Sequence, residues 1–162
     1  MKKNIFVVIA VCFCMLLLES RASAADFRIF DLRNKLFAQS KTINAMLPKA
    51  QDQAVLLSLF DTCIIVTSQI DAYFGMMGIF NAVRKEDLNK ETVGYLVNWL
   101  SEMKRTSEIT LRGLNEIPVA VQPTTRAQMA VIGKHLTDLV KLVQEDLSRM
   151  DELMKVVKVK KR

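Results

Sequence analysis

The chain has 162 residues, of which 51% are hydrophobic, and it carries 23 Lys and Arg against 17 Asp and Glu. Five of the cations lie in the last eight positions, which argues against nucleic-acid binding, because domains of that class carry a basic patch or stripe across their folded surface. Three cysteines and one histidine exclude a framework of several disulfides and any metal site with two histidines.

The N-terminal segment has the pattern of a secretory signal peptide. Two lysines precede an uncharged apolar run over residues 5–18, which is shorter than the roughly 20 residues that a bilayer-spanning helix needs. An Ala-Ser-Ala sequence ending at Ala24 supplies the small residues of a cleavage site. We therefore predict a leader over residues 1–24, cleavage after Ala24 or Ala25, and a periplasmic or secreted protein; an uncleaved signal anchor is the alternative.

The segment after the leader predicts two helices. Apolar residues spaced three and four apart predict the first over residues 26–46. Pro48 suits the first position of a helix, so we predict the second over residues 48–83. Its centre is apolar nearly all round, which predicts the most buried helix of the protein. Gly75 and Gly78 each cost about 1 kcal/mol relative to Ala in a helix, so we expect a kink or fraying there and a groove for a partner beside it.

Two more helices are predicted beyond a short polar break. The third covers residues 89–116, where apolar residues again recur at helical spacing. The fourth begins at Thr125, whose hydroxyl is expected to form a capping box with Gln128, and it continues as a heptad-like row of apolar residues. Because four amphipathic helices occur without a strand pattern, we predict an all-α fold: an antiparallel four-helix bundle that forms one domain over residues 25–157.

Few residues could support catalysis or hold a cofactor. His135 is the only histidine, which excludes the Glu-x-x-His pairs of di-iron bundles. The sequence has no nucleophile-elbow glycine pattern, no glycine-rich phosphate loop and no haem-attachment motif. We therefore predict a protein that is not an enzyme and has no cofactor. The alternatives are a bundle that binds a small apolar ligand or haem, with His135 and a methionine as axial ligands, and a Cu(I) site at Met76 and Met77.

A layer of polar side chains is predicted across the bundle. In two antiparallel helices, residues that are equally distant from the connecting turn lie at the same height in the bundle. For the third and fourth helices, this places His135 at the level of Thr106 or Ser107. Continued through the other helices, the same rule adds Thr67 and Asp31 to the same level. We treat this polar layer as a hypothesis, because a half-exposed histidine beside an apolar row is the ordinary outcome.

Cys63 is the one cysteine that remains once the leader is removed, so an intramolecular disulfide is excluded. Its apolar neighbours predict a buried thiol that packs as a small hydrophobe, and pairing with another molecule is the alternative. The aromatic residues Tyr73, Tyr95 and Trp99 are predicted to lie in the core or at its rim.

The C-terminal residues 158–162 form a basic tail, and the cations of this end are Lys155, Lys158, Lys160, Lys161 and Arg162. The simpler interpretation is a solvated helix end, since cations suit the C-terminal end of the helix dipole. The functional interpretation is adhesion to an anionic membrane or polysaccharide surface. The whole sequence thus predicts an exported binding module that presents helical faces to a protein partner in the cell envelope, with its oligomeric state left open.

Overall fold

A computed structural model describes residues 27–82, 90–117 and 121–159. The predicted leader, the cleavage site and the last three residues of the basic tail lie outside these ranges. The described residues form four α-helices and one turn of 3-10 helix, and they contain no strand. These elements are a helix over residues 27–46, here called the N-terminal helix, η1 (Leu47–Lys49), α2 (Gln53–Ala82), α3 (Lys90–Glu116) and α4 (Pro123–Val159).

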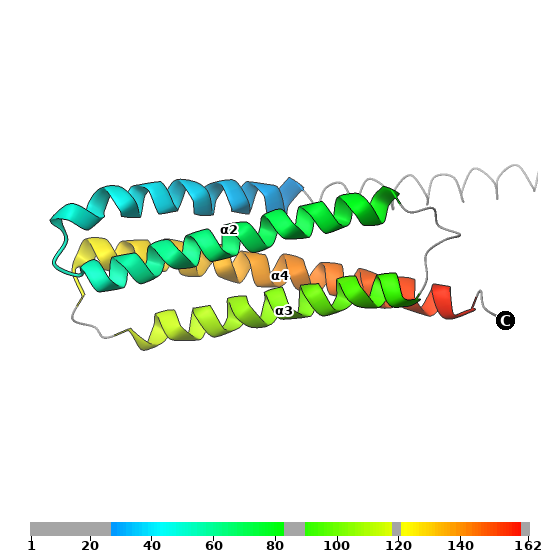
Figure 1. The fold of residues 1–162 in the computed structure, drawn as a ribbon. Coiled ribbons are helices and arrows are strands. Elements are labelled where there is room, and N and C mark those ends of the chain that lie inside the picture. The colour runs from blue at the N-terminus through cyan, green and yellow to red at the C-terminus, as the bar shows by residue number, and fades with distance from the viewer. Residues whose placement is uncertain (1–26, 83–89, 118–120, 160–162) are drawn as a thin grey trace, which may run out of the picture.

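The four helices of the described chain pack side by side, and each runs opposite to the one before it (Figure 1). α4 contacts both α2 and α3. The N-terminal helix lies beside α2, where the Phe30 and Phe74 rings meet edge to face with centroids 5.8 Å apart. The prediction of an all-α fold of four packed helices is confirmed.

The core lies along the axis of the bundle and is made almost entirely of aliphatic side chains. Each fully buried Leu or Ile contributes about 1.5–3 kcal/mol of transfer free energy. The heptad-like row predicted in α4 is part of this core. Fully buried members from the four helices include Leu36, Ile43, Leu56, Ile70, Leu100, Ile132, Leu136 and Leu139.

The second helix begins later than predicted. Pro48 lies in the short turn η1 rather than at the start of α2. The turn ends at Ala50, whose backbone is extended with φ −88° and ψ 144°. The first α-helical bond of α2 then runs from the Leu56 amide to the Asp52 carbonyl, at 3.0 Å. The prediction that the second helix starts at residue 48 is therefore wrong, because an extended residue separates the proline from the helix.

The capping box predicted at Thr125 does not form. α4 begins two residues before Thr125, with a proline in its first turn, and the Thr125 hydroxyl is buried without a hydrogen-bond partner among the described residues. The cap comes from another segment: the Gln122 amide donates to a carboxylate oxygen of Asp52, at 2.5 Å. A contact between distant segments thus replaces the local motif that the sequence suggested.

α2 differs from its prediction in two ways. It is a continuous helix through Gly75 and Gly78, with no glycine at positive φ in the described residues. It is also not buried all round, because large aliphatic residues such as Ile65 and Ile79 are exposed. By length and composition α2 is the one described helix able to span a membrane, and 33% of its most apolar stretch is buried. The core helices of soluble proteins meet the same criterion.

Candidate binding surface

The residues of the predicted polar layer occupy different environments. Ser107 is buried, and its hydroxyl donates to the Met103 carbonyl of its own helix, at 2.9 Å. Thr67 is also buried, but its hydroxyl has no hydrogen-bond partner among the described residues. Thr106 and His135 are half-buried. In the described part of the chain no hydrogen bond joins these four side chains, so the polar layer stays a hypothesis.

The surroundings of His135 disfavour its charged form. Partial burial lowers the pKa of His135 below its ordinary value, and the cations Lys35 and Lys134 lower it further, whereas Asp138 and Asp31 oppose the shift. Lys35 and Asp31 lie on the N-terminal helix, while the other two belong to α4. His135 is therefore a neutral residue at the boundary between these two helices at neutral pH.

We expect acidification to destabilise the protein through His135. A base whose pKa is lowered by folding binds protons more readily in the unfolded chain, so stability is lost as the pH falls through the unfolded value of 6.5. Changing His135→Gln should therefore reduce the drop in melting temperature between about pH 7 and about pH 5. Thermal unfolding followed by circular dichroism measures this drop, and an equal drop in both proteins would show that His135 has no energetic role.

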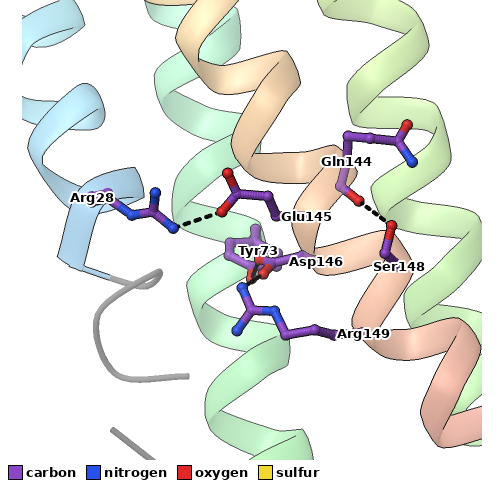
Figure 2. Close-up of polar contacts among 7 residues, drawn as sticks. All are labelled: Arg28, Tyr73, Gln144, Glu145, Asp146, Ser148 and Arg149. Carbon is purple, nitrogen blue, oxygen red and sulfur yellow. Dashed lines mark hydrogen bonds and ion pairs between the residues drawn. The ribbon is translucent and has the colours of Figure 1, made fainter. Parts of the chain in front are cut away.

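A polar cluster that the sequence did not reveal joins α2 to α4; Tyr73 and Asp146 are buried in it, and Arg149 lies at its edge. Figure 2 shows the side chains of Tyr73 and Arg149 converging on Asp146. The Tyr73 hydroxyl donates to one carboxylate oxygen of Asp146, and the Arg149 guanidinium donates to the other. Beside them, Arg28 of the N-terminal helix forms an exposed ion pair with Glu145, at 2.7 Å.

The chemistry of this cluster fits a structural role. Burial raises the pKa of Asp146, while the Tyr73 hydrogen bond and the charge of Arg149 lower it in part. Each carboxylate oxygen accepts a hydrogen bond from the protein itself, and Asp146 is almost fully buried, so the group is closed to a substrate from solvent. Within the described residues, no group of three or more His, Cys, Asp or Glu side chains is placed to hold a metal ion.

An apolar groove lies between the end of α2 and the start of α3, beside Gly75 and Gly78, where the sequence predicted a partner surface. Its volume is about 270 Å³, and apolar atoms make up nearly all of its wall. Two residues at the groove are unusually exposed for their size, Ile79 at 70% and Tyr95 at 64%. The lining residues are Met76, Ile79, Phe80, Thr92, Tyr95 and Leu96.

Exposed large hydrophobic residues are concentrated on two neighbouring helices of the described chain. Seven of the ten large hydrophobic residues exposed in the described chain lie on the N-terminal helix and α2. These two helices are neighbours, because Arg33 holds Asp71 through two hydrogen bonds of 2.9 and 3.0 Å. The seven residues are Phe27, Phe30, Phe37, Leu57, Ile64, Ile65 and Ile79.

The remaining predicted residues do not add to this surface. Cys63 is buried, as predicted, and burial raises the pKa of its thiol to about 11. Lys155 is exposed and pairs with Glu152 of the same helix, at 2.5 Å. The side chain of Lys158 and the residues Lys160, Lys161 and Arg162 lie outside the described part, so adhesion through the tail stays a prediction. His135 does not line the groove.

No protein family, curated protein or solved structure matches the chain. The arrangement of its own residues nevertheless separates two kinds of feature. The cluster at Asp146 is closed and satisfied from within. The groove between α2 and α3 is open, apolar and bordered by exposed side chains.

Proposed function

We propose that the protein is an exported, non-enzymatic helical module that binds a protein partner in the cell envelope. The groove between α2 and α3 is the observation that carries this proposal. Its wall is apolar, and two large side chains at its edge, Ile79 and Tyr95, are exposed to solvent, as anchoring positions for a partner would be. The proposal of export, with the leader cleaved after Ala24 or Ala25, rests on the N-terminal sequence pattern. Adhesion of the basic end of α4 to an anionic surface would add a second contact.

The openness of the groove favours a protein partner over a small molecule. Pockets for drug-sized ligands enclose most of the ligand, whereas this groove is bordered by the exposed residues Ile79 and Tyr95. An open depression of this kind suits the anchoring side chain of another protein. Methionine is adaptable and tyrosine is amphipathic, and both are enriched at protein interfaces, so Met76 and Tyr95 fit such a surface.

Site-specific crosslinking tests this function. With a photoreactive phenylalanine analogue in place of Tyr95, we expect irradiation of the intact cell envelope to give one discrete adduct with another protein. The matched control carries the analogue at Ile109, which is exposed on the same helix but does not line the groove. Absence of an adduct at Tyr95, or the same adducts from both positions, would contradict a partner-binding role for the groove.

A further inference from the structure

α2 carries two rows of residues at helix-packing spacing, on opposite sides. The first row, Leu56, Leu59, Cys63, Val66, Ile70 and Tyr73, steps by three and four and is buried in the bundle. The second row also steps by three and four, and every member is exposed. We call it the α2 seam: Ala54, Leu57, Asp61, Ile65, Ser68, Ala72, Gly75 and Ile79.

The spacing of the α2 seam is that of a surface which packs against another helix. Apolar positions repeated every three and four residues let side chains interlock along a partner helix. The seam combines three large aliphatic side chains with four small residues, which supplies both projections and hollows; the large members are Leu57, Ile65 and Ile79, and the small ones are Ala54, Ser68, Ala72 and Gly75. Ile79 belongs to the seam and also lines the groove between α2 and α3, so the two features form one continuous surface.

Gly75 supports this interpretation because the bundle does not need a glycine there. A Cβ atom added to Gly75 would have no atom within 4 Å among its neighbours. Glycine in a helix interior costs about 1 kcal/mol relative to alanine, and no close contact with the other described residues explains that cost. The bare backbone leaves room for another chain to approach closely.

The charge of α2 specifies which partner fits. α2 contains two acidic residues, Asp61 and Asp71, and no Lys, Arg or His. Asp71 is neutralised by Arg33 of the N-terminal helix. Asp61 lies in the middle of the seam, is exposed, and forms no ion pair within the described residues. The seam therefore presents an apolar row with one unpaired negative charge.

This charge disfavours two other ways of covering an exposed apolar helix face: contact with the hydrocarbon of a membrane, and pairing with a second copy of this chain. Contact with the hydrocarbon of a membrane would place the Asp61 carboxylate in a medium where acidic residues are costly. Pairing of two α2 seams from two copies of this chain would bring two carboxylates to the contact, and neither α2 helix carries a cation to neutralise them, in either orientation. A desolvated charge without a partner is strongly unfavourable.

We infer that the α2 seam binds one amphipathic helix of a partner protein, whose apolar row carries a Lys or Arg opposite Asp61. This inference rests on the proposed function and specifies its partner. Complementary charges at an interface select the partner and its register, so the Asp61 carboxylate sets which helix binds and in which alignment. The groove at Ile79 receives a side chain near one end of that helix.

Binding of two designed peptides to the purified protein tests the inference. Each peptide is helical, matches α2 in length and has a leucine and alanine row; one carries Lys and the other Glu at the position facing Asp61. Fluorescence anisotropy should show the Lys peptide binding about tenfold more tightly than the Glu peptide, and Asp61→Lys should invert this preference. Ile65→Lys should weaken both peptides, whereas Ile109→Lys, at a comparably exposed position of α3, should leave both unchanged.

Four outcomes would overturn the inference: binding of neither peptide, equal binding of both, retention of wild-type preference in Asp61→Lys, or binding that Ile65→Lys does not weaken. If the protein attaches to phosphatidylcholine vesicles and Ile65→Lys abolishes this attachment, the seam binds lipid. If the protein is a dimer in analytical ultracentrifugation and Ile65→Lys dissociates it, the seam binds a second copy. A crosslink at Tyr95 combined with any of these results would leave the partner-binding function standing. Circular dichroism of each variant verifies its fold.

Discussion

Leu56→Ala is expected to lower the free energy of unfolding by about 2–5 kcal/mol, whereas Leu57→Ala should lower it by less than about 1 kcal/mol. Leu56 is 0% exposed and belongs to the buried row of α2, while Leu57 is 51% exposed and belongs to the α2 seam. The two residues are adjacent, so the same atoms are removed from the same turn of the same helix. The difference between the variants therefore reports burial alone.

Urea denaturation followed by circular dichroism measures both values, and an unchanged dependence on urea concentration verifies that the same surface unfolds in each protein. Leu57→Ala serves as the control for the small change in helix propensity, which is common to both substitutions. Equal losses at the two positions would contradict the orientation of α2 and, with it, the exposed position of the seam.

The sequence predicts the core of α4 well because that helix has a clear polar side. Ile132, Leu136, Leu139 and Val143 repeat at spacings of three and four, and the structure buries all of them. Residues between them are largely charged or polar, so only one side of the helix can face the core. The four-helix architecture follows from the same reasoning applied to each segment.

The same reasoning fails for α2, where both sides are apolar. Leu56 and Leu57 cannot be distinguished by hydrophobicity, and the rows that contain them have the same spacing. Which row is buried depends on the residues of α3, α4 and the N-terminal helix that pack against α2, and these contacts are not encoded in the periodicity of α2 itself. The candidate surface was therefore only partly predictable: the sequence placed a groove near Gly75 and Gly78, although α2 is continuous there and neither glycine lines the groove, and it did not indicate the seam.

Contacts between distant segments explain the other differences. Tyr73 and Asp146 are 73 positions apart, and an acidic residue beside the apolar row of a helix is ordinarily exposed. Only the register between α2 and α4 brings the two side chains together. In the same way, Asp52 caps α4 across 70 positions, which no local pattern around Thr125 could indicate.

Tyr73→Phe is expected to lower the free energy of unfolding at neutral pH by about 1–3 kcal/mol, because it leaves a buried carboxylate oxygen of Asp146 without its donor. The ring of Tyr73 is retained, so packing against the core changes little. In an Asp146→Asn background the same substitution should cost less, since a neutral amide needs the hydroxyl less than a carboxylate does. Urea denaturation of the four proteins gives the coupling between the two residues.

The pH dependence of stability gives an independent measure of Asp146. Burial raises the pKa of Asp146 above its ordinary value of 3.8, so the folded protein holds this proton more tightly than the unfolded chain does. The stability contributed by this group is therefore fully present below pH 3.8 and is lost as the pH rises through the raised pKa of the folded state. Other carboxyl groups also titrate in this range, so the informative quantity is the difference between the wild type and Asp146→Asn.

As the pH falls from neutrality toward about 4, the wild type should gain stability relative to Asp146→Asn. The opposite trend would mean that the donors Tyr73 and Arg149 outweigh burial and hold the pKa of Asp146 below 3.8. No trend at all, together with no cost of Tyr73→Phe, would contradict the burial of this carboxylate between α2 and α4. Because Asp146 is 3% exposed in the structure, an isolated carboxylate in its place would be strongly destabilising, and the two donors explain how the bundle accommodates it.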